Sequence, residues 1–159
     1  MRRTLVILRH AKSGPPDGKP DVDRPLAERG MRDAPAVGRW LNEHVPKVDL
    51  VICSPAQRAR QTWQVAAGEF DADPRVVHDV HLYAASARDL AEVVRELPAE
   101  AATVLLVGHN PGLEDLVLAL SGEPCTLKTS SIAVLSGEGE WTDCAPGWAE
   151  LTATTTPRG

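Results

Sequence analysis

The sequence predicts an α/β fold, a three-layer α/β/α sandwich around a mainly parallel central sheet. Three short runs rich in aliphatic and β-branched residues carry this prediction: Thr4–Leu8, Asp49–Cys53 and Thr103–Val107. Such runs are typical of strands that are covered on both faces. Segments with helical spacing lie between them, and strands that alternate with helices indicate a parallel sheet.

The elements follow one another in a regular order. Thr4–Leu8 is the first strand, and the stretch Gly14–Asp23 after it has no periodicity and contains three prolines, so we expect a mobile loop. Gly30 and Pro35 interrupt the first helical segment, which predicts either a kink or a short turn that feeds a second helix. The helical segments cover residues 26–45, 56–70, 87–97 and 113–120.

Two late strands complete the predicted sheet. Ser131–Leu135 and Trp148–Thr154 are separated by a Gly-rich turn region. We expect them to finish one edge of the sheet, with an antiparallel orientation as one option.

Length and composition fit a single domain. The chain has 159 residues, of which 43% are hydrophobic, and a formal net charge of −5. A chain of this length buries roughly 70% of the surface that it exposes when unfolded, which is enough for an ordinary core. No internal repeat divides the sequence, so we expect residues 1–159 to form one domain.

Charge and cysteine content exclude several classes of protein. No apolar run approaches the ~20 residues that span a bilayer, so we expect no membrane association. The chain has 17 Lys and Arg against 22 Asp and Glu and no basic run, which argues against nucleic-acid binding. Cys53, Cys125 and Cys144 are odd in number and widely spaced, which predicts reduced thiols in a cytoplasmic protein and no metal site.

Polar residues follow the three strongest strands, at the edge of the sheet where α/β proteins bind ligands. Two histidines and two arginines brought together there would repel one another unless an anion lay among them. Guanidinium groups and helix N-termini both bind phosphate, so the pattern predicts a phosphoryl site. The residues, strand by strand, are Arg9, His10, Lys12 and Ser13; Ser54 and Arg58; and His109.

Three blocks of this sequence resemble the signature blocks of the histidine phosphatase superfamily, which has the phosphoglycerate-mutase-like fold. The blocks are Arg9–Ser13, Ser54–Thr62 and Gly108–Gly112. The short chain and the Arg-His-Ala-Lys-Ser form of the first block resemble the SixA-like phosphohistidine phosphatase branch. This resemblance implies that His10 is the nucleophile and becomes phosphorylated. It also implies that Arg9, Arg58 and His109 hold the phosphoryl oxygens.

The resemblance implies a metal-independent phosphatase without a cofactor, with phosphohistidine on a protein as its first expected substrate. Two alternatives stay open: a phosphatase for a small phosphoester or phosphoramidate, and a module that binds a phosphorylated ligand without turnover. Lys12 and Ser13 are candidate substrate-binding residues, although Lys12 and Arg60 could equally be solvated. A monomer is the simplest expectation for the oligomeric state.

The sequence does not assign the general acid of the predicted site to one residue. Relatives place a Glu before the second histidine or an Asp directly after it, but Asn110 follows His109 here. The candidates in this chain are Asp21, Asp23 and Asp79, and Asp23 could instead cap the turn that follows it. A strong acid matters less for phosphohistidine, because a protonated phosphoimidazole leaves as neutral imidazole.

Overall fold

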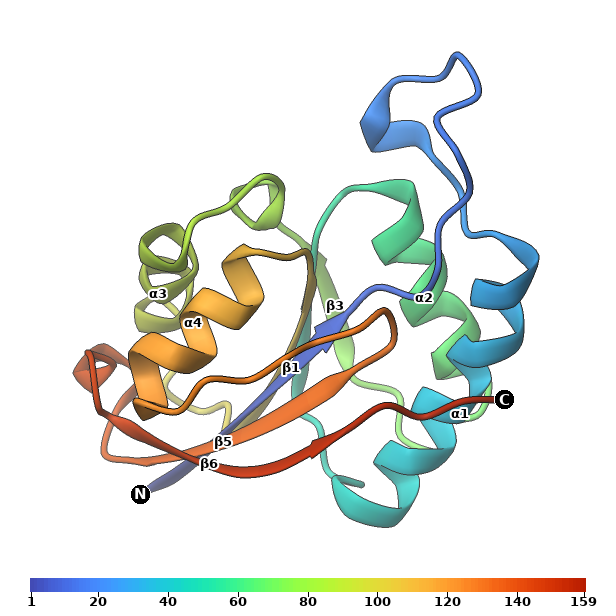
Figure 1. Cartoon of the computed structure of the whole chain (residues 1–159). Coiled ribbons are helices and arrows are strands. Elements are labelled where there is room, and N and C mark those ends of the chain that lie inside the picture. The colour runs from blue at the N-terminus through green and yellow to red at the C-terminus, as the bar shows by residue number, and fades with distance from the viewer.

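A computed structural model describes residues 1–159 as a six-stranded sheet with helices on both faces (Figure 1). The strand order is β3-β2-β4-β1-β5-β6. Parallel pairing joins β1 to β4, β4 to β2 and β2 to β3, whereas β5 runs antiparallel to both β1 and β6. The predicted mainly parallel sheet is therefore confirmed, and the last two strands take the antiparallel orientation that was one of the options. The strands are β1 (Arg2–Arg9), β2 (Leu50–Cys53), β3 (Arg75–His78), β4 (Thr103–Gly108), β5 (Ile132–Glu138) and β6 (Ala149–Thr155).

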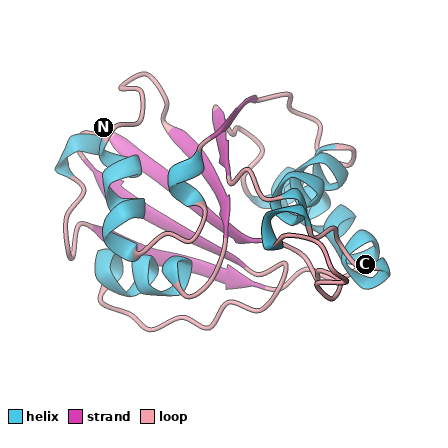
Figure 2. Cartoon of the chain, turned by 90° about the horizontal axis from the view of Figure 1, so that it is seen from above, coloured by secondary structure: helices cyan, strands magenta, loops and turns pink.

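Two helices cover each face of the sheet. Helices α1 and α2 pack together on one side and α3 and α4 on the other, so that the sheet lies between two helical layers (Figures 1 and 2). No helix combines the length and the apolar character that crossing a membrane requires. The helices are α1 (Glu28–His44), α2 (Gln57–Ala67), α3 (Ala87–Arg95) and α4 (Gly112–Ser121), with single 3₁₀ turns η1 (Asp21–Asp23), η2 (Val80–Leu82) and η3 (Trp141–Asp143).

The central strand β1 explains why its sequence is apolar at successive positions. Leu5 and Ile7 pack into the core under α3 and α4, and Val6 and Leu8 pack into the core under α1 and α2. All four side chains are almost completely buried. Side chains alternate between the two faces of a strand, so a strand covered on both sides needs apolar residues throughout. Each such side chain contributes roughly 1.5–3 kcal/mol of burial free energy.

Helix α1 differs from the prediction because it is one uninterrupted helix from Glu28 to His44. Pro35 lies inside this helix and does not divide it, so the alternative of a turn feeding a second helix is wrong. Gly30 has a packing role: a Cβ atom at this position would lie 2.2 Å from the carbonyl oxygen of Lys12. The glycine therefore lets α1 approach the backbone that follows His10.

Strand β3 is an element that the sequence analysis did not identify. Its four residues, Arg75–His78, are exposed or half-buried because the strand forms an edge of the sheet. It pairs on one side only, with β2. An edge strand of this kind lacks the continuous apolar run that marks β1, β2 and β4.

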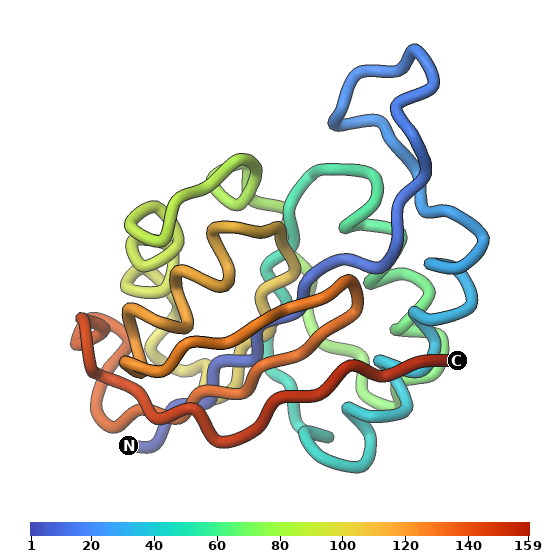
Figure 3. The backbone as a smooth tube through the Cα atoms, in the orientation of Figure 1, coloured from blue at the N-terminus to red at the C-terminus, as the bar shows by residue number.

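The segment Gly14–Asp23, expected to be a mobile loop, is held at its base. Ser13 pairs with Leu26, and Gly14 N donates a hydrogen bond to Pro25 O at 3.0 Å. Farther along, Arg24 Nη1 donates to Gly14 O at 3.0 Å. The loop projects beyond the sheet and extends past α2, as the blue segment of Figures 1 and 3 shows.

Candidate active site

Neighbouring strands bring the predicted residues to one edge of the sheet. Arg9 at the end of β1 is in register with Gly108 at the end of β4, and Cys53 at the end of β2 is in register with Val107. The residues that follow these strands therefore start from adjacent positions. The imidazole rings of His10 and His109 lie with their centroids 5.1 Å apart.

His10 is held in one tautomer by the backbone of the next residue, Ala11. Its Nδ1 atom lies 2.7 Å from the carbonyl oxygen of Ala11. A carbonyl oxygen can only accept a hydrogen bond, so Nδ1 carries the hydrogen and Nε2 of the neutral ring carries the lone pair. Burial, assisted by the nearby charges of Arg58 and Arg9, lowers the pKa of His10 to about 3. The ring is therefore neutral near neutral pH, and Nε2 is available as a nucleophile.

His109 is also a neutral imidazole near neutral pH. Burial, followed by the charge of Arg58, lowers its pKa to about 4. Its Nε2 atom lies 2.7 Å from Ser54 Oγ, which also accepts a hydrogen bond from Ala56 N at 3.2 Å. Ser54 Oγ can donate its hydroxyl hydrogen to His109 Nε2 while it accepts from Ala56 N, and in that arrangement the ring hydrogen lies on Nδ1 of His109.

The two arginines are anchored through their terminal nitrogens. Arg9 Nη1 donates to Leu127 O at 2.9 Å, and Arg58 donates from Nη1 to Asp21 O at 2.7 Å and from Nη2 to Asp21 Oδ2 at 3.0 Å. Arg58 lies in the first turn of α2, and its side chain is only 8% exposed. Both guanidinium groups are thus fixed before any ligand binds.

Three buried nitrogen atoms in this cluster have no hydrogen-bond partner: Arg9 Nε, Arg58 Nε and His109 Nδ1. A buried donor without a partner costs about 1–3 kcal/mol, so such groups are rare unless a ligand satisfies them. Three of them beside His10, two on cationic groups, indicate a ligand that is anionic and rich in acceptor oxygens. A phosphoryl group has these properties.

The three candidate acids have different surroundings. Asp21 lies at the site and bonds to Arg58, and its Oδ2 atom also accepts from Tyr83 OH at 2.5 Å. Asp79 caps η2 and accepts from the backbone and ring of His81 instead. Asp23 has an exposed side chain that takes part in no hydrogen bond or ion pair. Of the three, only Asp21 touches one of the predicted cations.

The candidate substrate-binding residues Lys12 and Ser13 follow His10 directly. Lys12 is exposed and its side chain makes no hydrogen bond or ion pair, while Ser13 is half-buried and pairs with Leu26 through its backbone. Arg60 on α2 is likewise exposed.

Tyr83 is a site residue that the sequence analysis missed. It is the single tyrosine of the chain, and its ring packs edge-on against His109 at 5.7 Å between centroids. Its hydroxyl group bonds to Asp21, which lies 62 residues earlier. No local spacing pattern in the sequence predicts a contact between residues so far apart along the chain.

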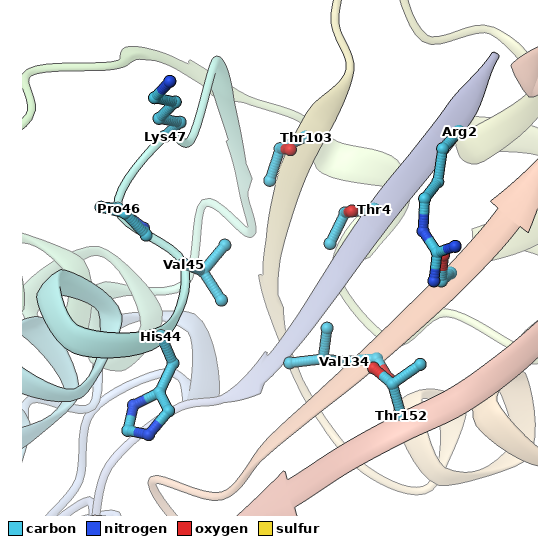
Figure 4. Close-up of a pocket in the computed structure, with 10 residues that line it drawn as sticks. Arg2, Thr4, His44, Val45, Pro46, Lys47, Thr103, Val134 and Thr152 are labelled. Carbon is cyan, nitrogen blue, oxygen red and sulfur yellow. The ribbon is translucent and has the colours of Figure 1, made fainter.

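One hollow of the surface lies beside the site, and a second hollow lies away from it. One of about 320 Å³ lies beside His109, between Asn110–Gly112 and Ala84–Ser86. A larger hollow of about 380 Å³ lies at the opposite edge of the sheet and is lined by Arg2, His44 and Lys47 (Figure 4). It contains none of the predicted site residues. No group of three or more His, Cys, Asp or Glu side chains is arranged to hold a metal ion.

Comparisons with known proteins show which family this chain resembles. Residues 5–83 match the model of the histidine phosphatase superfamily, branch 1, a range that includes Arg9, His10 and Arg58. An uncharacterized protein of Mycobacterium tuberculosis strain H37Rv is 40% identical over 162 residues, which cover 95% of this chain and 100% of that protein.

Solved structures extend the similarity to almost the whole chain. A protein of Nakamurella multipartitia, assigned as the phosphohistidine phosphatase SixA, is 35% identical with a TM-score of 0.87, over 99% of this chain and 97% of that chain. A protein of Agrobacterium tumefaciens with the same assignment is 28% identical with a TM-score of 0.82, over 98% of each chain.

Proposed function

The chain belongs to the histidine phosphatase superfamily, and we propose that it removes phosphate from phosphohistidine on a protein through a phosphorylated His10. The observation that carries the proposal is the set of unpartnered buried nitrogens of Arg9, Arg58 and His109 around a neutral His10. A set of donors fixed in advance is what phosphoryl transfer requires most from a protein.

In the proposed first step, the lone pair of His10 Nε2 attacks the phosphorus atom. A bond forms between Nε2 and phosphorus while the bond from phosphorus to the leaving imidazole breaks, and the leaving ring takes that electron pair. The hydrogen stays on Nδ1 of His10, and its hydrogen bond to Ala11 O stabilises the positive charge of the phosphorylated ring. Arg9, Arg58 and His109 stabilise the charge on the three equatorial oxygens.

In the proposed second step, water attacks the phosphorus atom of phospho-His10. A bond forms between the water oxygen and phosphorus, the bond between Nε2 and phosphorus breaks, and its electron pair returns to Nε2. One hydrogen of the water leaves on inorganic phosphate and the other passes to solvent. No metal ion takes part in either step, because the two guanidinium groups supply the positive charge.

The choice of substrate follows from the absence of a free carboxylic acid. Asp21, the carboxylate at the site, has its pKa lowered to about 2, first by the hydrogen bond from Tyr83 and then by Arg58. It holds no proton to donate near neutral pH. Phosphohistidine needs none when its own ring is protonated, whereas an alkyl ester leaves as an alkoxide that requires protonation.

A series of substrates tests this proposal. We expect kcat/KM to be highest for a phosphohistidine protein, measurable for phosphoramidate and an aryl phosphate, and poor for phosphoserine and sugar phosphates. Equal rates for alkyl and aryl phosphates would show that a competent acid exists and would contradict the proposed substrate preference. Turnover of none of these substrates, with binding of inorganic phosphate retained, would instead support a binding module.

A further inference from the structure

We propose that Asp21 is a positioning residue: it fixes the orientation of the Arg58 guanidinium at the phosphoryl site, and it does not serve as the general acid. This inference rests on the proposed function, since it assigns a role within the same site.

The first support is the two-point contact between Asp21 and Arg58. The backbone carbonyl of Asp21 accepts from Nη1 at 2.7 Å, and its carboxylate accepts from Nη2 at 3.0 Å. Two bonds from one residue fix the plane of the guanidinium and not only its distance. They use one N–H group of each terminal nitrogen, and Nε is buried and has no partner. Asp21 thus determines how the guanidinium of Arg58 is oriented at the site.

The second support is that the Asp21 carboxylate is itself held by three donors. Oδ2 accepts from Tyr83 OH as well as from Arg58, and Oδ1 accepts from Arg24 Nε at 3.0 Å. Arg24 in turn donates to Gly14 O, at the start of the same loop. The Asp21 carboxylate is the acceptor in each of these contacts, so each contact stabilises its ionised form.

The third support is the place of Asp21 between separate parts of the fold. It belongs to the loop that projects from the body in Figure 3, yet it joins Arg58 of α2 to Tyr83, which follows η2. Tyr83 packs edge-on against His109. The Gly14–Asp23 loop is therefore tied to both sides of the site through one side chain.

The two roles for Asp21 predict different dependences on the substrate. Loss of a general acid slows poor leaving groups far more than good ones and leaves the binding of a bare oxyanion unchanged. Loss of a positioning residue slows all substrates alike and weakens the binding of the oxyanion. Removing a group that orients a site residue typically costs about 10- to 100-fold.

The test compares Asp21→Ala and Asp21→Asn with the wild type. For both variants we expect kcat/KM to fall by about 10- to 100-fold for phosphoramidate, an aryl phosphate and phosphoserine alike. We expect the Kd of vanadate, measured by calorimetry, to rise by a similar factor. Asn preserves the shape of Asp21 but replaces one acceptor oxygen with an NH₂ group, which cannot accept from Arg58, Tyr83 or Arg24.

Asp17→Asn is the matched control. Asp17 lies in the same loop, is exposed and makes no side-chain hydrogen bond or ion pair, so its substitution removes one negative charge without breaking a contact. Asparagine also tolerates the positive φ of 49° at this position. We expect this variant to retain wild-type values of kcat/KM and of the vanadate Kd.

A double-mutant cycle completes the test. In an Arg58→Ala background, Asp21→Ala should cause no further loss, because the group that it positions is gone. A loss restricted to phosphoserine with an unchanged vanadate Kd would identify Asp21 as the acid. Wild-type values of kcat/KM and of the vanadate Kd in the two Asp21 variants, or tighter binding of vanadate by them, would also overturn the proposal. If the wild type itself neither turned over nor bound vanadate, the proposed function would fail, an outcome distinct from any of these.

Discussion

His10 shows how one side chain is prepared by its immediate neighbours. The carbonyl of Ala11 determines which ring nitrogen carries hydrogen, and burial keeps the ring neutral. A strongly basic imidazole would be protonated, and its Nε2 could not attack phosphorus. The same cations that help to keep His10 neutral are those that would stabilise the transferred phosphoryl group.

The first prediction for single residues concerns the phosphoryl clamp, the set of Arg9, Arg58 and His109 that is proposed to hold the phosphoryl oxygens. Arg58→Ala and His109→Ala should each reduce kcat by about 10²–10³, the usual loss when one fixed donor to developing charge is removed. Steady-state kinetics with an aryl phosphate measures the effect. Chelators should leave the wild type unchanged; loss of activity with EDTA that a divalent ion restores would contradict a metal-independent clamp.

The two histidines give a prediction for stability. Their pKa values of about 3 and about 4 in the folded protein lie below the ordinary value of 6.5. As the pH falls below 6.5, the unfolded chain binds protons that the folded protein does not, so the free energy of unfolding decreases. Each histidine should contribute up to about 1.4 kcal/mol per pH unit, until its folded-state pKa is reached.

Urea unfolding between pH values of about 7 and 4.5 measures this slope. The double variant His10→Asn with His109→Asn is the comparison, and it should lose stability more slowly over the same range. An identical slope in the wild type and the double variant would show that the two rings are not the groups responsible.

Individual site residues differ in how far the sequence could predict them. Arg9, His10, Arg58 and His109 could be placed because each directly follows a strongly apolar strand or starts the helix after one. Asp21 could be proposed only as one of three acids, and Tyr83 was missed. Their bond joins residues 62 positions apart through loops whose paths no local pattern determines.

Among the helices and strands, burial explains why the sequence reveals β1, β2 and β4 but not β3. β1, β2 and β4 lie inside the sheet and are apolar throughout, so they were predicted. β3 forms an edge, and its exposed residues carry no such signal. Gly30 misled the prediction for α1 because glycine was interpreted as an interruption, whereas its role is close packing against Lys12.

That close packing gives a prediction for α1. Gly30→Ala would place a Cβ atom 2.2 Å from Lys12 O, so the helix or the backbone after His10 must move. Overpacking of this kind costs about 1–3 kcal/mol, and we also expect reduced activity because the displaced backbone adjoins the nucleophile. Thermal unfolding and kinetics of the same variant measure the two effects.

Gly68→Ala is the matched control for this change. Gly68 ends α2 with helical backbone angles, and the nearest atom to an added Cβ lies 3.4 Å away. We expect unchanged activity and a stability within about 0.5 kcal/mol of the wild type. Equal effects of the two substitutions would show that the contact between Gly30 and Lys12 is not restrictive.

At the scale of the whole molecule, the three layers were predictable because double coverage of a sheet affects composition directly. The sequence left the orientation of the last two strands open. Strands pair through backbone hydrogen bonds, so the side chains of a strand do not determine whether it runs parallel or antiparallel to its neighbour. In the structure β5 pairs antiparallel with the central strand β1, which places β5 between β1 and β6.

The sharing of β1 between both cores predicts cooperative unfolding. Residues of this strand alternate between the core under α1 and α2 and the core under α3 and α4, so neither layer can be lost without exposing the other. Differential scanning calorimetry should show one transition, with equal calorimetric and van't Hoff enthalpies of roughly 110 kcal/mol near 60 °C. Two resolved transitions would contradict a single domain over residues 1–159.

The proposed mechanism requires that the phosphoryl group is transferred to His10 before water releases it. Trapping the phosphorylated protein tests this step most directly. The wild type and His10→Ala are mixed with a labelled aryl phosphate, quenched in base and digested, and the labelled peptide is identified by mass spectrometry. We expect acid-labile, base-stable phosphate on His10 in the wild type, and neither label nor turnover in the folded variant. Equal turnover by the variant, or stable label on another residue, would contradict the mechanism.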